Sequence, residues 1–323
     1  MKESIVTEDK RRARARLPEV LSPEHSMTNS SSSNSDRTAE ETKISVKAIE
    51  AYRAKSYLPE RRLATVKQAI KFVRKRGFVF FWPIKGIEFP SLWTAVAGDR
   101  PVANEHDDPG HVTWGWKDQM LGKRKWYYAK LLRKKATLIS LEAAPYFYAL
   151  TENYGDPEQD YLIQYEAGRL KQENKLVYEA LLRNGAMDTV ALRRKVGLTS
   201  KESKYRFERA LVELQADMKI LPIGVAEAGA WNYAFIYDLV PRHFPDLPDQ
   251  ARRIKESEAR LELARLYFRS VGAASAKELG KVFGWRKTQL RTVIQQAEQA
   301  GWVRSGLIGE NSNEELIALP ELL

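Results

Sequence analysis

The chain has 323 residues, a formal net charge of +11 at pH 7 and no cysteine. Disulfides, a thiolate nucleophile and a sulfur-ligated metal are therefore excluded. No apolar run is long enough to cross a bilayer, so we expect a soluble, cytoplasmic protein of two or three domains without a membrane partner. The surplus of positive charge favours a polyanionic partner, and nucleic acid first.

Residues 1–43 lack helical or strand periodicity and are predicted to form a disordered tail. Helices are predicted at 46–57 and 65–76, with Gly77 as the left-handed stop of the second. From Arg61 to Lys85 the sequence contains eight Lys or Arg residues and no acid. This one-signed run predicts phosphate contacts, for which the candidates are Arg74, Lys75 and Arg76.

The segment that follows, Phe78 to Trp82, is apolar and β-prone and ends at Pro83. We interpret it as a buried strand that closes a core, because large aromatic side chains are usually buried. The alternative is a surface of exposed rings, on which Phe80 and Trp82 would stack against bases.

Residues 99–121 are predicted to form a loop, and within it lies His106-Asp-Asp-Pro-Gly-His111. Two imidazoles and two carboxylates in six residues are compatible with a metal or with acid–base chemistry. Asp-Pro-Gly is also ordinary turn chemistry, and no second ligand cluster accompanies it, so we favour a turn and predict no metal.

The stretch 122–135 carries seven basic residues, no acid and three adjacent rings. Basic side chains bind phosphates, and flat aromatic rings stack on unpaired nucleobases. This stretch therefore predicts a nucleic-acid surface. An amphipathic helix with its rings facing inward is the alternative. The predicted DNA contacts are Lys123, Arg124, Lys125, Trp126, Tyr127, Arg133, Lys134 and Lys135.

From residue 156 onward one pattern occurs twice, at 176–197 and at 264–284. Each copy predicts a helix, a glycine turn and an N-capped second helix that ends at glycine. A longer helix follows, at 201–217 and 287–300, and then two strand-like segments. Three helices and a β-hairpin are typical of a winged helix.

The predicted fold class is therefore α+β, mostly helical, with tandem winged-helix modules and a small β-containing part. The predicted domains are 44–155, which is winged-helix-like and contains the basic, aromatic stretch, and the two winged helices at 156–245 and 246–323.

The third helix of a winged helix usually enters the major groove of DNA. In the first of the two copies, Lys204 and Arg206 are the predicted DNA contacts. In the second copy they are Lys287, Gln289 and Arg291, because Arg and Gln can read base edges.

Tandem modules preceded by a basic, aromatic segment resemble the AlkZ/YcaQ family of bacterial winged-helix DNA glycosylases. The sequence from Ala259 to Leu279 resembles the start of that family's final winged helix, and Gly77 to Ile84 resembles the segment after its first module. The resemblance covers about residues 45–320 and implies binding and repair of damaged duplex DNA, with no cofactor.

In that family a Gln-x-Gln or Gln-x-Asp pair precedes Pro-Ile, and in this chain Phe80 and Trp82 occupy those positions. Neither side chain can orient a water or stabilise a cationic sugar, so the implied glycosylase chemistry is in doubt. The remaining catalytic candidates are Glu88, Asp107 and Asp108. Two other hypotheses stay open: a non-catalytic DNA-binding transcription regulator, and a metal-assisted hydrolase that uses the segment from His106 to His111.

Overall fold

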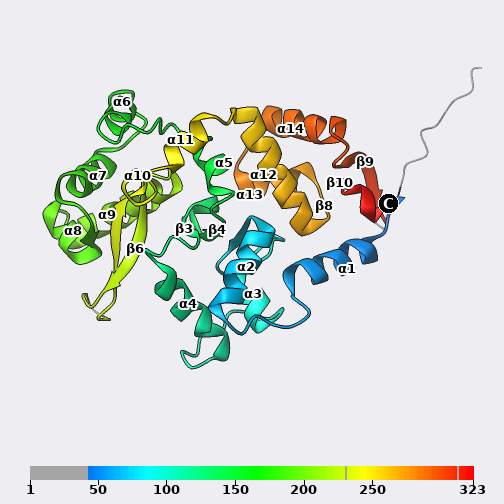
Figure 1. Ribbon diagram of the computed structural model, residues 1–323, viewed down its shortest axis with the longest axis horizontal. Helices are drawn as coiled ribbons and strands as arrows, with labels where there is room; N and C mark the ends of the chain where they lie inside the picture. The colour runs from blue at the N-terminus through cyan, green and yellow to red at the C-terminus, as the bar shows by residue number, and fades with distance from the viewer. Residues whose placement is uncertain (1–42, 230, 311–312) are drawn as a thin grey trace, which may run out of the picture. The chain divides into compact units, whose positions relative to one another are not determined.

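The computed structural model describes residues 43–229, 231–310 and 313–323 (Figure 1). The predicted tail therefore lies outside the described residues, except for residue 43. The described chain is mixed α+β, with many short helices and three small sheets. None of its described helices has both the length and the apolar character needed to cross a bilayer.

One succession of elements occurs three times: helix, short strand, two helices and a two-stranded hairpin. The first repeat contains α2 (Val66–Arg76), β2 (Phe78–Phe80), α3 (Leu92–Ala97), α4 (Val112–Met120), β3 (Tyr127–Lys130) and β4 (Ala136–Ile139). The second contains α7 (Gln172–Asn184), β5 (Met187–Asp188), α8 (Thr189–Lys195), α9 (Lys201–Ala216), β6 (Ile220–Ala226) and β7 (Ala234–Leu239). The third contains α12 (Glu256–Val271), β8 (Ala273–Ala274), α13 (Ala276–Phe283), α14 (Lys287–Gln299), β9 (Arg304–Gly309) and β10 (Glu315–Ala318).

The three sheets share a topology. In each repeat the last strand lies in the middle, with the short first strand on one side and the remaining hairpin strand on the other. In the third repeat β1 (Lys43–Ile44) also joins the sheet, parallel to β9. The helices and hairpins predicted for the second and third repeats are present, and most of their ends lie within three residues of the prediction. The first helix of each repeat begins earlier than predicted, at Gln172 instead of 176 and at Glu256 instead of 264. For the first repeat the sequence predicted a winged-helix-like domain but not all of its elements, since α4 lies in a segment expected to be a loop.

The remaining elements lie before, within, between or after the repeats. They are α1 (Val46–Tyr57), η1 (Pro109–His111), η2 (Leu132–Lys134), α5 (Ala144–Tyr148), α6 (Asp160–Glu166), α10 (Val240–His243), α11 (Leu247–Arg252) and η3 (Pro320–Leu322). The helix α1 has the predicted bounds. From it, Arg53 donates hydrogen bonds to the carbonyls of Val271 and Ala273, at the end of α12. Cationic donors at a helix C-terminus satisfy carbonyls that have no partner within the helix.

Helix starts follow the capping chemistry of the sequence. Thr65 and Gln68 form a reciprocal capping box at α2, and Ser275 and Glu278 form another at α13. The carboxylate of Asp188 accepts from two backbone amides at the start of α8. These contacts satisfy amides that have no partner within the helix, and they explain why the predicted boundaries are close to the observed ones.

One expectation was wrong. Residues 112–120 form the helix α4 rather than a loop. Gly115 and two tryptophans are poor helix formers, so local propensity did not indicate α4. The helix forms because Trp116 and Met120 are buried in the first repeat.

The aromatic run after α2 joins the first repeat to the third. Phe78 stacks on Phe89 at 4.8 Å between ring centroids, and Phe89 stacks on Tyr267 of α12 at 5.6 Å with planes 1° apart. Phe283 of α13 meets Phe78 edge-on at 5.6 Å. The predicted buried strand is confirmed, since Phe78, Val79 and Phe80 are at most 1% exposed. One hydrophobic core therefore contains residues from different predicted domains. The domain boundaries themselves stay a prediction.

Gly77 ends α2 in the conformation that the sequence predicts. Its φ is +83°, and a Cβ added there would lie 2.7 Å from a methyl carbon of Leu266. Gly185 has a similar φ of +81° at the end of α7, but a Cβ added there would have no other atom within 4 Å. The two glycines share a positive φ and differ in ψ, which is −48° at Gly77 and −162° at Gly185, and in what an added Cβ would contact.

We expect Gly77→Ala to lower the free energy of unfolding by about 2–4 kcal/mol, from left-handed strain plus overpacking against Leu266. Gly185→Ala should lower it by only about 1–2 kcal/mol, from strain alone. Urea denaturation of both variants measures the difference. Equal losses would show that the contact with Leu266 does not matter.

A buried lysine holds the segment before α6 against the second repeat. Lys219 is 3% exposed, and its Nζ donates to Oδ1 of Asn153 at 2.5 Å. Burial lowers the pKa of Lys219 to about 8, although Asp217 and Asp160 act to raise it. Between this value and the ordinary pKa near 10.5, the unfolded chain binds more protons than the folded one, so stability must rise with pH.

We expect the urea midpoint of the protein to rise relative to that of Lys219→Met as pH increases from about 8 to about 9.5, the interval in which folded and unfolded states differ in protonation of this lysine. The variant in which Met replaces the exposed Lys201 should show the same rise relative to Lys219→Met. Parallel pH profiles of the protein and of Lys219→Met would rule out this lysine as the source of the difference.

Candidate nucleic-acid interface

The rings of the basic, aromatic stretch lie on or next to β3, and most of its cations lie in the turns before and after that strand. Trp126, Tyr127 and Tyr128 are 3%, 0% and 8% exposed and pack in the core. This corrects the prediction that Trp126 and Tyr127 contact DNA, because neither ring reaches the surface. The alternative, in which the rings face inward, is the one observed, on a strand instead of a helix.

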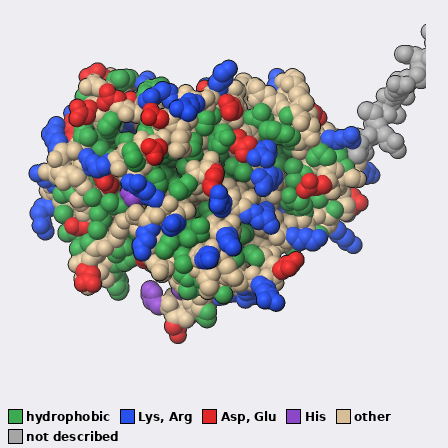
Figure 2. Space-filling view, viewed as in Figure 1, with side chains coloured by type: hydrophobic (Ala, Val, Ile, Leu, Met, Phe, Trp, Pro, Cys, Tyr) green, Lys and Arg blue, Asp and Glu red, His purple; other side chains and the backbone are tan. Residues whose placement is uncertain are grey.

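The basic residues of the same stretch point outward. Lys123, Arg124, Lys125, Arg133, Lys134 and Lys135 are all exposed. Among the described residues only Lys134 of this set forms an ion pair, at 3.7 Å from Glu213. Figure 2 shows Lys and Arg side chains gathered over the middle of one face, interspersed with apolar and a few acidic ones. The cations of the hairpin are therefore largely uncompensated and available to a polyanion.

Three of these cations sit on strained backbone. Arg124, Arg133 and Lys134 have φ values of +50°, +54° and +57°. Arg133 and Lys134 are the central pair of the turn between β3 and β4, which the amide of Lys135 closes on the carbonyl of Leu132 at 2.9 Å. Such positions favour Asn and Gly, and each other residue costs about 1–2 kcal/mol there. Strain of this kind is concentrated at functional sites.

The cations of α2 have three different environments. Arg74 pairs with Glu142 at 2.7 Å, and Lys75 is exposed. Arg76 is partly buried and donates to Oγ of Ser56 and to the carbonyl of Arg269. Burial lowers the pKa of Arg76. This corrects the prediction for Arg76, which binds the end of α12 instead of a phosphate.

The third helices of the second and third repeats differ in charge compensation. On α9, Lys204 lies 3.8 Å from Glu208, and Arg206 lies 3.0 Å from Glu173. On α14, Lys287 and Arg291 line an open groove of about 770 Å³ between α13, α14 and the hairpin. The side chain of Gln289 accepts a hydrogen bond from the amide of Arg286 and so caps its own helix. The third repeat therefore offers the freer cations, and the oxygen of Gln289 is already engaged.

Glu213 is the centre of the charge network on α9. It lies 2.6 Å from Lys171 and 2.9 Å from Arg209, and it also meets Lys134 of the first repeat. Burial acts to raise the pKa of Glu213, but hydrogen bonds from Lys171, Arg209 and Asn174 lower it to about 2. Its charge therefore persists at neutral pH and neutralises the cations around it.

The two aromatic residues at the positions of the family's polar pair have different exposures. Phe80 is 1% exposed and packs edge-on to Phe89, so its ring is out of reach of a base, which corrects the stacking prediction for this residue. Trp82 is partly exposed and lies 5.6 Å from Trp114 of α4, whose ring is 40% exposed. The Nε1 of Trp82 is buried without a partner among the described residues. The pair formed by Trp82 and Trp114 is thus a surface on which a planar group can stack.

Lys117 lies next to this pair, enclosed by rings. It is 3% exposed, and its Nζ lies 4.6 Å from the ring centroid of Phe235 and 5.2 Å from that of Trp114. Nζ also lies 2.9 Å from Oδ1 of Asp118 and donates to the hydroxyl of Tyr233 at 2.9 Å. Burial lowers the pKa of Lys117, while Asp118 acts to raise it. These contacts tie the third helix of the first repeat to the hairpin of the second.

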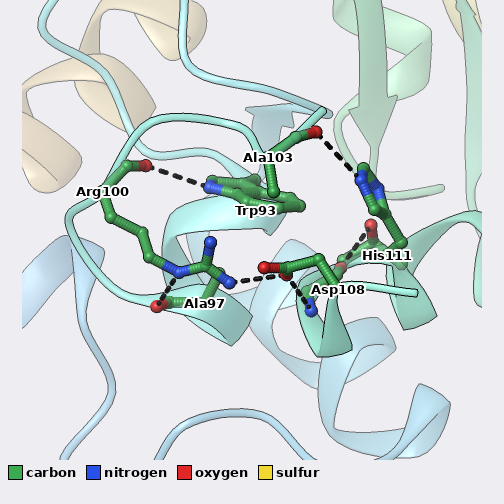
Figure 3. A network of polar contacts seen from close by, with 8 residues as sticks. Trp93, Ala97, Arg100, Ala103, Asp108 and His111 are labelled. Carbon is green, nitrogen blue, oxygen red and sulfur yellow. Dashed lines mark hydrogen bonds and ion pairs between the residues drawn. The ribbon is translucent and has the colours of Figure 1, made fainter. Parts of the chain in front are cut away.

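The loop that contains His106 and His111 is held by structural contacts (Figure 3). The carboxylate of Asp108 accepts from Arg100 at 2.6 Å and from the amide of Gly110 at 2.7 Å. The hydrogen bond from Arg100 lowers the pKa of Asp108. The Nε2 of His111 lies 3.0 Å from the carbonyl oxygen of Ala103. The turn interpretation is confirmed for Asp108, which caps η1.

The other catalytic candidates have little around them. Glu88 and Asp107 are exposed. In the part of the chain that the structure describes, no three His, Asp or Glu side chains come together in a way that could hold a metal ion. The described residues therefore offer cationic and aromatic side chains to a ligand, and Glu88 and Asp107 are not part of a preorganised acid–base pair among them.

A family model described as AlkZ related matches residues 63–284. The chain belongs to the AlkZ-related family. Its fold is similar to that of Streptomyces sahachiroi DNA glycosylase AlkZ, with a TM-score of 0.54 and 14% sequence identity over 87% of this chain and 71% of that one. No curated protein sequence matches the chain.

This AlkZ-related chain presents further surface residues that the sequence did not indicate. Trp231 is 91% exposed in the loop between β6 and β7. Trp114, which is 40% exposed, lies in the segment 99–121 that the sequence predicts to be a loop. A tryptophan beside Asn232 in a hairpin loop was a usable signal, because a ring in a turn has no sheet face to pack against.

Asp118 is the counter-charge of the buried Lys117. We expect Asp118→Asn to lower the free energy of unfolding by about 2 kcal/mol, because the buried ammonium of Lys117 loses that counter-charge. Lys117→Met added to that variant should recover much of the loss, since the rings keep an apolar partner. A double-mutant cycle by urea denaturation measures the coupling. Additive losses would mean that the two charges do not depend on each other.

Proposed function

We propose that the chain binds duplex DNA through three winged-helix modules and recognises damaged sites in it. The succession of helix, strand, two helices and hairpin in each repeat supports this reading. Membership of the AlkZ-related family and the likeness to a DNA glycosylase, AlkZ of Streptomyces sahachiroi, point in the same direction.

The observation that carries the proposal is the hairpin of the first repeat. It presents Lys123, Lys125, Arg133 and Lys135 without acidic partners among the described residues. It also maintains left-handed backbone at Arg124 and at the turn. A purely solvated surface has no need of strained cations, whereas a phosphate-binding surface gains from having their side chains held in place.

The exposed rings support a preference for damaged DNA. Trp114 and Trp231 offer faces on which an unpaired base can stack, and extrusion of a base costs least at a damaged or mismatched position. A transcription regulator would instead favour one operator sequence.

Glycosidic hydrolysis by the family's polar pair is not part of the proposal. Phe80 is buried and Trp82 has no group that can activate water, while Asp108 is occupied by Arg100. Glu88 and Asp107 are exposed carboxylates for which the described residues supply no built partner. We therefore propose recognition of damage without cleavage at these positions.

The test uses fluorescence anisotropy with duplexes of identical sequence, with and without an alkylated base. We expect tighter binding of the alkylated duplex and no abasic sites after incubation. Abasic-site formation would overturn the non-cleaving part of the proposal, and equal affinity for both duplexes would overturn damage recognition.

We also expect the combined replacement of Lys123, Arg124 and Lys125 by Ala to reduce the slope of log affinity against log salt by about 2–3, at ~0.9 per lost phosphate contact. The matched control replaces Lys204 and Arg206 by Ala, because both already have acidic partners. Its slope should change much less. An unchanged slope in the triple variant would show that the hairpin is only solvated.

A further inference from the structure

A cavity of about 330 Å³ lies where the hairpin turn of the first repeat meets the third repeat. Its walls come from parts of the chain far apart in sequence: the turn at 131–133, the end of α5, the α9–β6 junction, α12, and the turn between α13 and α14. Ligand sites in proteins have volumes of this order and commonly form at such junctions.

The cationic groups of the cavity come from two repeats. Arg133 lines it from the strained turn, and Arg260 lines it from α12. The Nε of Arg260 is buried without a hydrogen-bond partner among the described residues, while its Nη1 pairs with Glu256. No Asp or Glu is among the described residues that line the cavity. Two guanidinium groups without a lining acid favour an anion, and phosphate matches their planar donor geometry.

The rest of the lining is apolar and partly aromatic. Phe283 and Trp285 are stacked at 4.2 Å with planes 10° apart, and both line the cavity together with Leu131 and Leu150. Gln289 lines it as well, and its amide nitrogen takes no part in the bond that caps α14. Apolar walls with one amide donor suit a flat, partly polar group such as a nucleobase.

The two cations of the turn, Arg133 and Lys134, line different hollows. Arg133 faces the cavity, whereas Lys134 lines a separate groove beside Glu213 on the second repeat. Both residues have positive φ, and their side chains line different hollows on the two sides of the turn. Asn-Gly would form this turn at lower cost, so the strain is explained by the placement of the side chains.

We propose that this cavity binds one unpaired nucleotide, with its phosphate on Arg133 and Arg260 and its base against the apolar wall of Phe283 and Leu131. The binding of an unpaired nucleotide within a DNA strand rests on the proposed function. A free nucleotide offers the same chemistry, and the experiment separates the two sources.

The test measures binding of the full chain to three probes: a fully paired duplex, the same duplex with a one-nucleotide bulge, and free dAMP. Arg133→Gly is the test variant and Lys134→Gly is its matched control. Both remove one positive charge from the same turn, and both relieve left-handed strain, so each should keep or raise the melting temperature.

We expect the bulged duplex to bind at least about tenfold more tightly than the paired one. Arg133→Gly should remove most of that advantage and leave paired-duplex affinity within about threefold. Lys134→Gly should weaken both duplexes alike and keep the advantage. Binding of dAMP that Arg133→Gly abolishes, without a bulge advantage, would support the cavity with a free nucleotide as its ligand.

The proposal is overturned if Arg133→Gly and Lys134→Gly affect the bulged duplex equally and neither affects dAMP, because general electrostatics then account for binding. If no duplex binds at all while dAMP binding depends on Arg133, the proposed DNA function fails and the nucleotide cavity stands.

Discussion

The structure depends on the contact between the aromatic run after α2 and the helices of the third repeat. Phe78, Phe89, Tyr267 and Phe283 form one continuous group of stacked and edge-on rings. Gly77 allows the chain to turn sharply into this group, directly against Leu266. Because the first and third repeats share this core, their surfaces are held in one arrangement, and a cavity can form between them.

The second repeat is joined to the first by charge as well as by apolar contact. Lys117 reaches the rings of the β6–β7 hairpin, and Lys134 reaches Glu213 on α9. Many cations of α9 are neutralised by acids on the same repeat, while those of the first hairpin are not. The net charge of +11 therefore says less about where DNA would bind than the distribution of the charges does. Cations without acidic partners are the ones available to contact phosphates and release counterions from DNA.

The chain has the family fold, and at the two positions where the resemblance implies a polar pair it has Phe80 and Trp82. Phe80 is part of the core, and its removal from solvent stabilises the junction between repeats. A polar side chain there would have to be buried without a partner or would have to open the core. Trp82 keeps one edge near the surface, beside Trp114. In this chain the segment contributes packing and a stacking surface.

Local sequence signals were sufficient for the second and third repeats. Capping residues such as Asp188 and Ser275, and glycine stops at fixed spacing, act within a few residues, so helix ends and hairpins could be predicted from them. The elements of the first repeat were only partly predicted, because α4 contains Gly115 and is stabilised by the burial of Trp116 and Met120 rather than by propensity.

The candidate site required the tertiary structure. Sequence alone determined that 122–135 contains both cations and rings, but only packing decides which of them are buried. Both faces of β3 are covered, with Tyr127 in one hydrophobic cluster and Trp126 and Tyr128 in another, whereas the cations lie in the turns before and after the strand. Arg133 and Arg260 lie far apart in the chain and line one cavity only because the first and third repeats share an aromatic core, so local sequence gives no sign of it.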